Sequence, residues 1–352
     1  METPRLCDVK VVVDQAIPFI KGVLEPYVHV VYKEGKSICR EDLSDAQAIV
    51  IRTRTACDAS LLEGTAVKMI STATIGTDHV DIPWCDSHGI LVRNAPGCNA
   101  GGVMEYVFSA LYGLAARRSI NLSGKNLGII GVGHVGGRVN HMAKQLGFRT
   151  LLCDPPRAER EGPFGFVDLD TLLRESDIVT LHVPLNPTTS RLANAEFFRK
   201  MKKGAFFINS SRGEVMVDAD LKKAIGYLGP VVIDTWNGEP DIDQELLEMV
   251  DIGTPHIAGY SYQGKQNGTA AAVRAIAHFF GISELYEFYP PTEYPENEAV
   301  KLDLRGKSQG EIAAALQYNY PVFTDDFLLR MSPGDFERLR SEYRYRREVY
   351  VD

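Results

Sequence analysis

Short apolar runs alternate with segments of helical periodicity along most of the chain, and they fall into two series. The first series has four runs typical of buried strands, at 9–13, 48–52, 67–73 and 90–94. The second has six, at 127–131, 150–154, 177–183, 205–210, 231–236 and 251–257. Because strands alternate with helices, the pattern predicts an α/β fold with parallel sheets covered by helices on both faces.

The segments between and after these strands indicate the organisation of the chain. A long helix is expected after Asn99, and a turn and helix from 258 onward return to the first series. Beyond 288 a proline-rich polar stretch leads into a tail dense in Arg and Tyr. We therefore expect a smaller α/β domain formed by 1–98 and 258–288, a doubly wound domain over 99–257, and a C-terminal region over 289–352.

A glycine motif occupies the first turn of the second series. Gly131, Gly133 and Gly136 form G-x-G-x-x-G between a strand and a helix, and Asp154 lies 18 residues after the last glycine. These glycines permit a tight turn, close backbone approach to a pyrophosphate, and close helix–strand packing, while an acid at this distance can bind a ribose. The motif predicts a bound dinucleotide. Its expected contacts are Gly131, Gly133, His134, Val135, Gly136 and Asp154.

Asp154 also bears on the choice of dinucleotide. A 2′-phosphate close to this carboxylate would meet like-charge repulsion, on the order of a few kcal/mol at ~4 Å in a partly screened site. NAD is therefore expected rather than NADP, although Arg157 lies close enough to soften the preference.

Three polar residues follow three successive strands of the second series. Arg212 lies in NSSRG, Glu239 in DTWNGEP and His256 in TPHIAGYS. In open α/β sheets, ligands bind outside the carboxyl ends of the strands, so the three can converge on one crevice. His256 can accept a proton near neutral pH, Glu239 can orient the imidazole, and Arg212 can hold a carboxylate. This set predicts oxidation of a secondary alcohol next to a carboxylate. Separately, each residue is also compatible with a surface ion pair or a solvated turn.

The first series offers a basic loop after its second strand. Arg52, Thr53 and Arg54 lie within IRTRT, and two arginines so close together would suit a phosphate group. The alternative is a solvated loop with one arginine paired to an acid.

Composition narrows the class of protein. The chain has 352 residues, 45% apolar, a formal net charge of −8, and no apolar run near the ~20 residues of a membrane helix. The negative charge argues against nucleic acid and anionic membranes as partners. The start has no signal-peptide pattern, and six scattered cysteines lack metal-site spacing. We expect reduced thiols, no metal, and a cytoplasmic protein.

The order GxGxxG, NxxRG, D-x-W-x-x-E-P and PHIAG resembles the D-isomer-specific 2-hydroxyacid dehydrogenases across roughly 8–285. The resemblance implies a Rossmann-type NAD domain, a flavodoxin-like substrate domain and a C-terminal dimerisation region that forms a homodimer. It implies that Arg212, Glu239 and His256 are catalytic. Substrate contacts would come from Arg52, Thr53, Arg54, Thr72 and Tyr260. Further NAD contacts would come from Val183, Ser210, Ser211, Arg212, Asp234 and Gly259.

The chain also departs from the family pattern at two places. NAGGVMEYV has glycines where the family usually has larger apolar residues, and Glu214 stands where a small residue is common. The expected substrate is a small phosphorylated hydroxyacid, with 3-phosphoglycerate or another D-2-hydroxyacid as rivals. An NAD-sensing binding protein is the alternative from another class.

Overall fold

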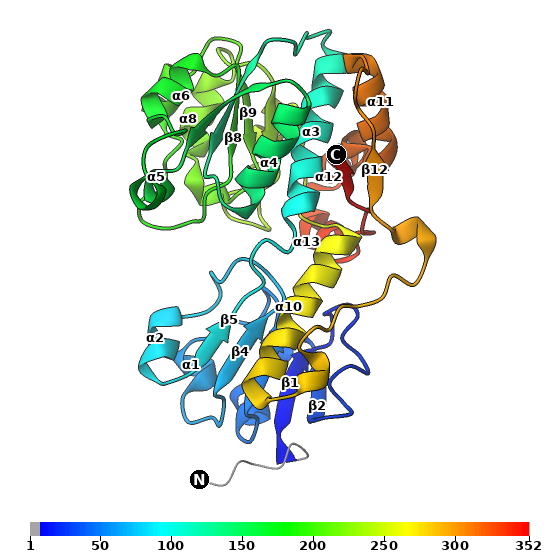
Figure 1. The fold of residues 1–352 in the computed structure, drawn as a ribbon. Coiled ribbons are helices and arrows are strands. Elements are labelled where there is room, and N and C mark those ends of the chain that lie inside the picture. The colour runs from blue at the N-terminus through cyan, green and yellow to red at the C-terminus, as the bar shows by residue number, and fades with distance from the viewer. Residues whose placement is uncertain (1–7, 352) are drawn as a thin grey trace. The chain divides into compact units, whose positions relative to one another are not determined.

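The computed structural model describes residues 8–351, and the chain forms two compact units (Figure 1). Unit 1 consists of Met1–Asn99 and Tyr262–Asn297, and unit 2 of Ala100–Ser261 and Glu298–Asp352. The chain therefore passes between units at 99/100, 261/262 and 297/298. The C-terminal region groups with unit 2 and does not form a third compact unit.

Unit 1 contains a five-stranded, wholly parallel sheet. Its order is β2-β1-β3-β4-β5, with bounds His29–Lys33, Lys10–Asp14, Ala48–Ile51, Met69–Thr72 and Leu91–Arg93. Four of the strands confirm the sequence prediction. The prediction missed β2, a partly exposed edge strand whose sequence HVVYK mixes polar and apolar residues.

Helices and a second chain segment complete unit 1. The short helices are α1 (Ala59–Leu62) and α2 (Ile82–Ser87), each capped by an aspartate side chain. The long helix α10 (Tyr262–Phe280) packs against β4, and the Ser71 hydroxyl donates to the carbonyl of Ala272. Helix α10 thus buries the core face of a sheet formed by the first hundred residues.

Unit 2 contains the doubly wound sheet, again wholly parallel. Its order is β11-β10-β9-β8-β6-β7, with bounds Ile252–Gly253, Val231–Ile233, Phe206–Asn209, Ile178–Leu181, Asn126–Ile130 and Arg149–Cys153. All six predicted strands are confirmed, although β10 and β11 are shorter than predicted. The other helices of the Rossmann portion are α4 (His134–Gln145), α5 (Pro155–Glu161), α6 (Leu169–Glu175), α7 (Ala195–Lys200), α8 (Asp218–Ala224) and α9 (Gln244–Met249).

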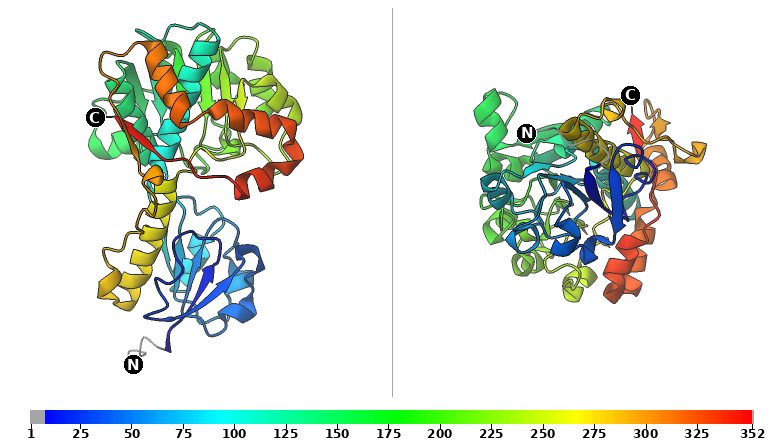
Figure 2. Two further views of the ribbon diagram at one scale, coloured as in Figure 1. Left: turned by 90° about the vertical axis from the view of Figure 1, so that its right-hand side faces the viewer. Right: turned by 90° about the horizontal axis from the view of Figure 1, so that it is seen from below.

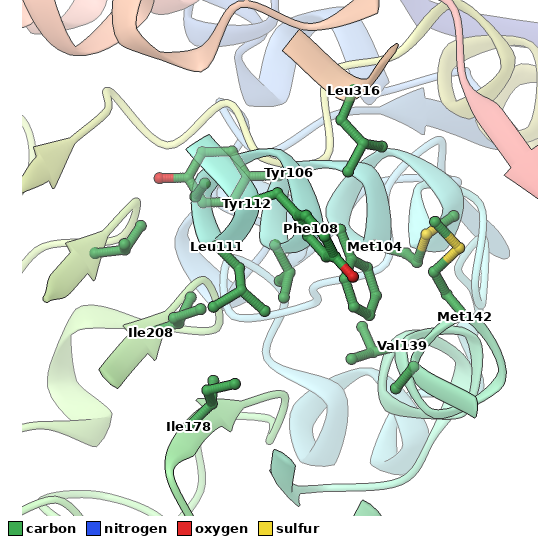
Figure 3. Packing of buried hydrophobic residues seen from close by; sticks show 14 of the residues in the cluster. Met104, Tyr106, Phe108, Leu111, Tyr112, Val139, Met142, Ile178, Ile208 and Leu316 are labelled. Atoms are coloured by element: carbon green, nitrogen blue, oxygen red, sulfur yellow. The ribbon is translucent and has the colours of Figure 1, made fainter. Parts of the chain in front are cut away.

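The central helix of unit 2 is α3 (Ala100–Arg117), in which every residue from 100 to 115 is buried. Figure 3 shows Phe108 and Leu111 of this helix packed among Val139, Ile178 and side chains of neighbouring elements. A helix buried all round needs partners on every side. The sheet and α4 supply some of these partners, and the C-terminal region supplies the rest.

The C-terminal region folds onto α3 as β12 (Val300–Leu302), α11 (Gln309–Asn319), α12 (Val322–Met331), α13 (Phe336–Ser341) and β13 (Val349–Val351). Ser308 and Glu311 form a capping box that starts α11, whose Leu316 is fully buried in the α3 core. Strands β12 and β13 pair in parallel. Figures 1 and 2 show this segment, coloured orange to red, alongside α3. Among residues 8–351, no helix is long and apolar enough to cross a membrane.

Candidate active site

The three predicted catalytic residues all lie in unit 2, each just beyond the end of a strand. Arg212 follows β9, Glu239 follows β10 and His256 follows β11, and these strands are direct neighbours in the sheet. Parallel strands end at the same edge, so the topology brings the three loops to one side of the sheet.

Glu239 and His256 form a hydrogen-bonded pair. His256 Nδ1 lies 2.8 Å from Glu239 Oε2, and the other carboxylate oxygen accepts the Trp236 amide at 2.9 Å. Burial raises the pKa of the Glu239 carboxyl, but the His256 hydrogen bond and charge, the Trp236 amide and the Arg340 charge bring it below its ordinary value. The carboxylate therefore stays ionised, and its contact with Nδ1 leaves His256 Nε2 on the far side of the ring.

The backbone at His256 has an unusual conformation. Its φ is +55°, in the left-handed region that non-glycine residues seldom adopt. The amide of His256 donates to the carbonyl of Asp234, and the buried Asp234 carboxylate accepts the amides of Ile257 and Ala258. Such strain persists only where surrounding contacts over-determine it, and it gathers at functional sites. Asp234, which was predicted as a cofactor contact, thus holds the loop after His256 through hydrogen bonds to its backbone amides.

Arg212 is set by the loop after β9. Its carbonyl accepts the Asn209 side-chain amide at 3.0 Å, and its Nη1 donates to the carbonyl of Ser211 at 2.8 Å. The Ser211 hydroxyl donates to Asn209 Oδ1, also at 2.8 Å. A side chain on the next residue, Gly213, would overlap the Trp236 backbone, so the loops after β9 and β10 pack in direct contact.

The glycine turn has the form that a pyrophosphate site requires. Gly131 has φ +84°, and a Cβ on Gly136 would overlap the carbonyl of Gly131. A Cβ on Gly133, in contrast, would meet no atom of the described chain within 4 Å. Gly133 is the N-cap of helix α4 and provides no side-chain cap, so the first N–H groups of the helix are left for an anion. The turn therefore fits a dinucleotide phosphate over Gly133, His134 and Val135.

Asp154 directly follows β7, as expected for a residue at the end of a strand, and it also caps α5. One carboxylate oxygen accepts the Arg157 amide at 3.0 Å, and the other accepts the Val132 amide at 2.8 Å. The Arg157 guanidinium donates to the carbonyl of Val132 at 2.7 Å. Asp154 thus holds the glycine turn, and its remaining lone pairs are the ones that could accept from a ribose.

Other predicted cofactor contacts lie along the same edge. Within residues 8–351, three buried polar atoms at the ends of β8, β9 and β10 have no hydrogen-bond partner: His182 Nδ1, Ser210 Oγ and Thr235 Oγ1. Burial lowers the pKa of His182 to about 3, so its ring is neutral. Val183 lines the Gly131 turn, and Gly259 lies in the loop after His256. Unsatisfied polar atoms at this edge fit a polar ligand such as a dinucleotide.

The predicted substrate contacts of unit 1 are held by their own sheet. Arg52 Nε is 3.1 Å from the buried carboxylate of Asp14, as the ion-pair alternative anticipated. Thr53 and Arg54 are exposed in the turn after β3. The Thr72 side chain is fully buried, and its hydroxyl lies 2.7 Å from that of Thr74.

Tyr260, the predicted substrate contact in unit 2, is surrounded by the C-terminal segment. Its ring packs edge-on against Tyr343 and Tyr345, and its hydroxyl accepts from Arg340 Nε at 3.1 Å. Sequence reasoning did not single out Arg340, which also approaches Glu239. An arginine in an Arg- and Tyr-rich tail resembles a surface residue, and the only sequence signal was the pair of unexpected glycines in α3.

Comparison with known proteins agrees with this geometry. Residues 109–258 match the model of the D-isomer specific 2-hydroxyacid dehydrogenase NAD-binding domain. A 3-phosphoglycerate dehydrogenase of Entamoeba histolytica, solved with NAD⁺, superimposes with a TM-score of 0.67 at 26% identity, covering 80% of this chain and 98% of that one. The chain belongs to the D-isomer specific 2-hydroxyacid dehydrogenase family, and it is an NAD-dependent oxidoreductase.

Within that family, the similarity to one kind of enzyme extends over nearly the whole length. An erythronate-4-phosphate dehydrogenase of Bacteroides fragilis is 44% identical, with 96% of this chain and 97% of the relative covered. One of Yersinia pestis is 41% identical over 96% of this chain and 92% of the relative. The matched length includes most of the C-terminal region, which lies outside the family-model match.

Proposed function

We propose that the chain oxidises 4-phospho-D-erythronate to 2-oxo-3-hydroxy-4-phosphobutanoate with NAD, as a step of pyridoxal 5′-phosphate synthesis. The observation that carries the chemistry is the Glu239–His256 pair, a base already oriented by an ionised carboxylate. The observation that carries the substrate is the similarity, over almost the whole chain, to proteins named erythronate-4-phosphate dehydrogenase.

The roles of the residues follow from their chemistry. NAD, when bound over the glycine turn, supplies the acceptor for the hydride that leaves C2 of the substrate. His256 Nε2 accepts the proton of the C2 hydroxyl, so that the C–O bond becomes a carbonyl, and Glu239 stabilises the imidazolium. Arg212 holds the adjacent carboxylate in a forked geometry. Arg52, Thr53 and Arg54 are the proposed phosphate contacts of unit 1.

The substrate is tested by comparing three acids under identical conditions. We expect kcat/KM to be highest for 4-phospho-D-erythronate, because both of its charged ends find a partner. D-Erythronate lacks the phosphate, and 3-phosphoglycerate is one carbon shorter, so each should be at least about tenfold poorer, the effect of one lost charge-assisted hydrogen bond. If 3-phosphoglycerate has the highest kcat/KM, the substrate is wrong while the dehydrogenase reaction stands.

The same kinetic measurement distinguishes an enzyme from the alternative, an NAD-sensing binding protein. Such a protein would bind NAD without sustained turnover of any hydroxyacid. The complete set of Arg212, Glu239 and His256 favours catalysis, and steady NADH formation with a phosphorylated hydroxyacid is the expected result.

We also propose that the chain acts as a homodimer in the cytoplasm. Four of its thiols are buried and unbridged, as in proteins of reducing compartments, and the dimer is supported by large apolar side chains left exposed on the C-terminal helices. Phe327 and Met331 on α12 are 60% and 66% exposed. Removal of 290–352 would uncover α3 and is not a clean test. We expect the full chain to scatter light as a dimer and the Phe327→Asp, Met331→Asp double variant as a monomer.

The control for this test is Phe164→Asp, which changes an exposed phenylalanine in the loop after α5. This variant should remain dimeric. A monomeric wild type, or a double variant that stays dimeric, contradicts this interface.

A further inference from the structure

The C-terminal segment of the chain reaches the Glu239–His256 pair. Arg340, on α13 (Figure 1), places its Nη1 4.0 Å from Glu239 Oε2, the same oxygen that faces His256 Nδ1. The side chains of Arg340, Glu239 and His256 are 15%, 20% and 26% exposed, so the three form one partly buried cluster. In such surroundings a charge at this distance acts far more strongly than on an open surface.

Arg340 is held in this place by Tyr260. Its Nε donates to the tyrosine hydroxyl at 3.1 Å, and its guanidinium lies 5.9 Å from the centroid of the same ring. The guanidinium therefore connects a residue proposed to touch the substrate with the carboxylate that orients the base. One planar, permanently charged group performs both tasks, which neither lysine nor a neutral side chain could do equally well.

A second arginine of the C-terminal segment binds the backbone of the loop after His256. The buried Arg346 donates to the carbonyls of Gly102, Ile257, Ala258 and Tyr260, and its guanidinium lies 3.9 Å from the centroid of the Tyr320 ring. The loop after His256 is thus bound to the tail through its own backbone.

One of the unexpected glycines of α3, Gly101, makes room for this tail, and the other, Gly102, lies close to Ser261 in the loop after His256. Glu348 accepts the amide of Gly102 at 3.0 Å and the hydroxyl of Ser261 at 2.7 Å. A Cβ on Gly101 would overlap the Glu348 carboxylate. At Gly101, the departure from the family pattern noted in the sequence therefore leaves space for a side chain of the C-terminal segment.

We propose that Arg340 is a positioning residue of the active site, which holds the Glu239 carboxylate and the Tyr260 hydroxyl in register for the reaction. This inference rests on the proposed roles of Glu239, His256 and Tyr260, and it makes the C-terminal segment part of the site as well as of the core. The charge of Arg340 also contributes to the lowered pKa of Glu239.

Few charged groups surround this pair, so a pH profile can report on it. In the described chain the charged or titratable side chains that contact Glu239 are His256 and Arg340. Tyr260 and Glu337 lie within electrostatic reach of Arg340, and the buried Asp234 carboxyl lies within electrostatic reach of His256. Asp234 is the same in all the variants compared. Loss of the arginine charge favours protonation of the Glu239–His256 pair, because a neighbouring positive charge is removed. The acid limb of the activity profile should therefore move to higher pH.

The experiment compares Arg340→Gln, Arg340→Lys and the control Arg338→Gln. Arg338 lies on the same helix but is exposed, with partners Asp335 and Glu342. Arg340→Gln should lower kcat by about tenfold to a hundredfold and move the acid limb up by about one pH unit, while NADH binding measured by fluorescence is retained. Arg340→Lys keeps the charge and should recover the position of the limb and part of kcat. Arg338→Gln should match the wild type.

Rates are measured with whichever 2-hydroxyacid the wild type oxidises fastest, so an error in the proposed substrate does not alter the ratios. The proposal is overturned if Arg340→Gln keeps its kcat, or if kcat falls without movement of the acid limb and equally in Arg340→Lys. Should Arg340→Gln fail to fold, Arg340→Met, which keeps much of the side-chain length, takes its place in the same comparison.

Discussion

The carboxyl ends of the two sheets hold their polar side chains in different ways. In unit 1, Arg52 and Thr72 are bound by neighbours of their own sheet, Asp14 and Thr74. In unit 2, Asp234 holds the loop that follows the histidine of the Glu239–His256 pair. Arg340, about a hundred residues further along the chain, contacts the glutamate. We therefore propose that the base of the chemical step is fixed within unit 2 and that the exposed basic loop of unit 1 serves substrate binding.

This contrast predicts that substitutions in unit 2 act on kcat and those in the unit 1 loop act on KM. Interactions made only in the transition state lower kcat when removed, and interactions made equally with the bound substrate change KM.

The largest effect is expected at His256. His256→Asn, which tolerates the positive φ, should lower kcat by roughly 10²–10⁴-fold, the usual contribution of a general base. NADH affinity should change little, because the glycine turn is intact. The measurement is steady-state turnover beside a fluorescence titration with NADH. His141→Asn on the exposed side of α4 is the matched control, and turnover near the wild-type level in His256→Asn would refute the role of the histidine.

An intermediate effect is expected in the basic loop of unit 1. Substitution of its two arginines should have different effects on KM and on the free energy of unfolding. Arg54→Ala should raise KM for the phosphorylated substrate by about tenfold, as expected for one lost charge-assisted hydrogen bond. Arg52→Ala leaves the buried Asp14 carboxylate without its ion pair, so it should in addition lower the free energy of unfolding by about 1–3 kcal/mol.

Arg93→Ala, an exposed arginine of β5, is the control for this pair. Kinetics and thermal unfolding of all three variants provide the check. Equal melting temperatures of the Arg52 and Arg54 variants would show that the Arg52–Asp14 contact is energetically unimportant.

An effect of similar size, but confined to the choice of cofactor, is expected at Asp154. Asp154→Asn can still cap α5, but it loses the acceptor for the Val132 amide and the charge that repels a 2′-phosphate. The ratio of kcat/KM for NAD over NADP should fall by about tenfold, since the repulsion removed is on the order of a kcal/mol or more. Asp168→Asn, which changes the cap of α6, should leave the ratio unaltered. An unchanged ratio in Asp154→Asn would assign cofactor choice to another residue.

The sequence alone determined the architecture and the chemistry of the strand ends. Hydrophobic periodicity located all six strands of the doubly wound sheet and four of the five in the other. Spacing within single loops singled out Gly131, Asp154, Arg212, Glu239 and His256. Both signals are local, since a strand shows its period over a few residues and a phosphate turn over six.

Only the tertiary structure decided which residues support that chemistry. Asp154 proved to cap a helix, because the cap depends on backbone directions that spacing does not reveal. Strand β2 was missed because an edge strand need not be continuously apolar. Arg340 and Arg346 act on loops about 80 to 100 residues away, and a lone arginine shows no periodicity. Burial, and with it the strength of a charge, is a property of the packed chain, so the sequence could name the base and its partner but not the arginine beside them.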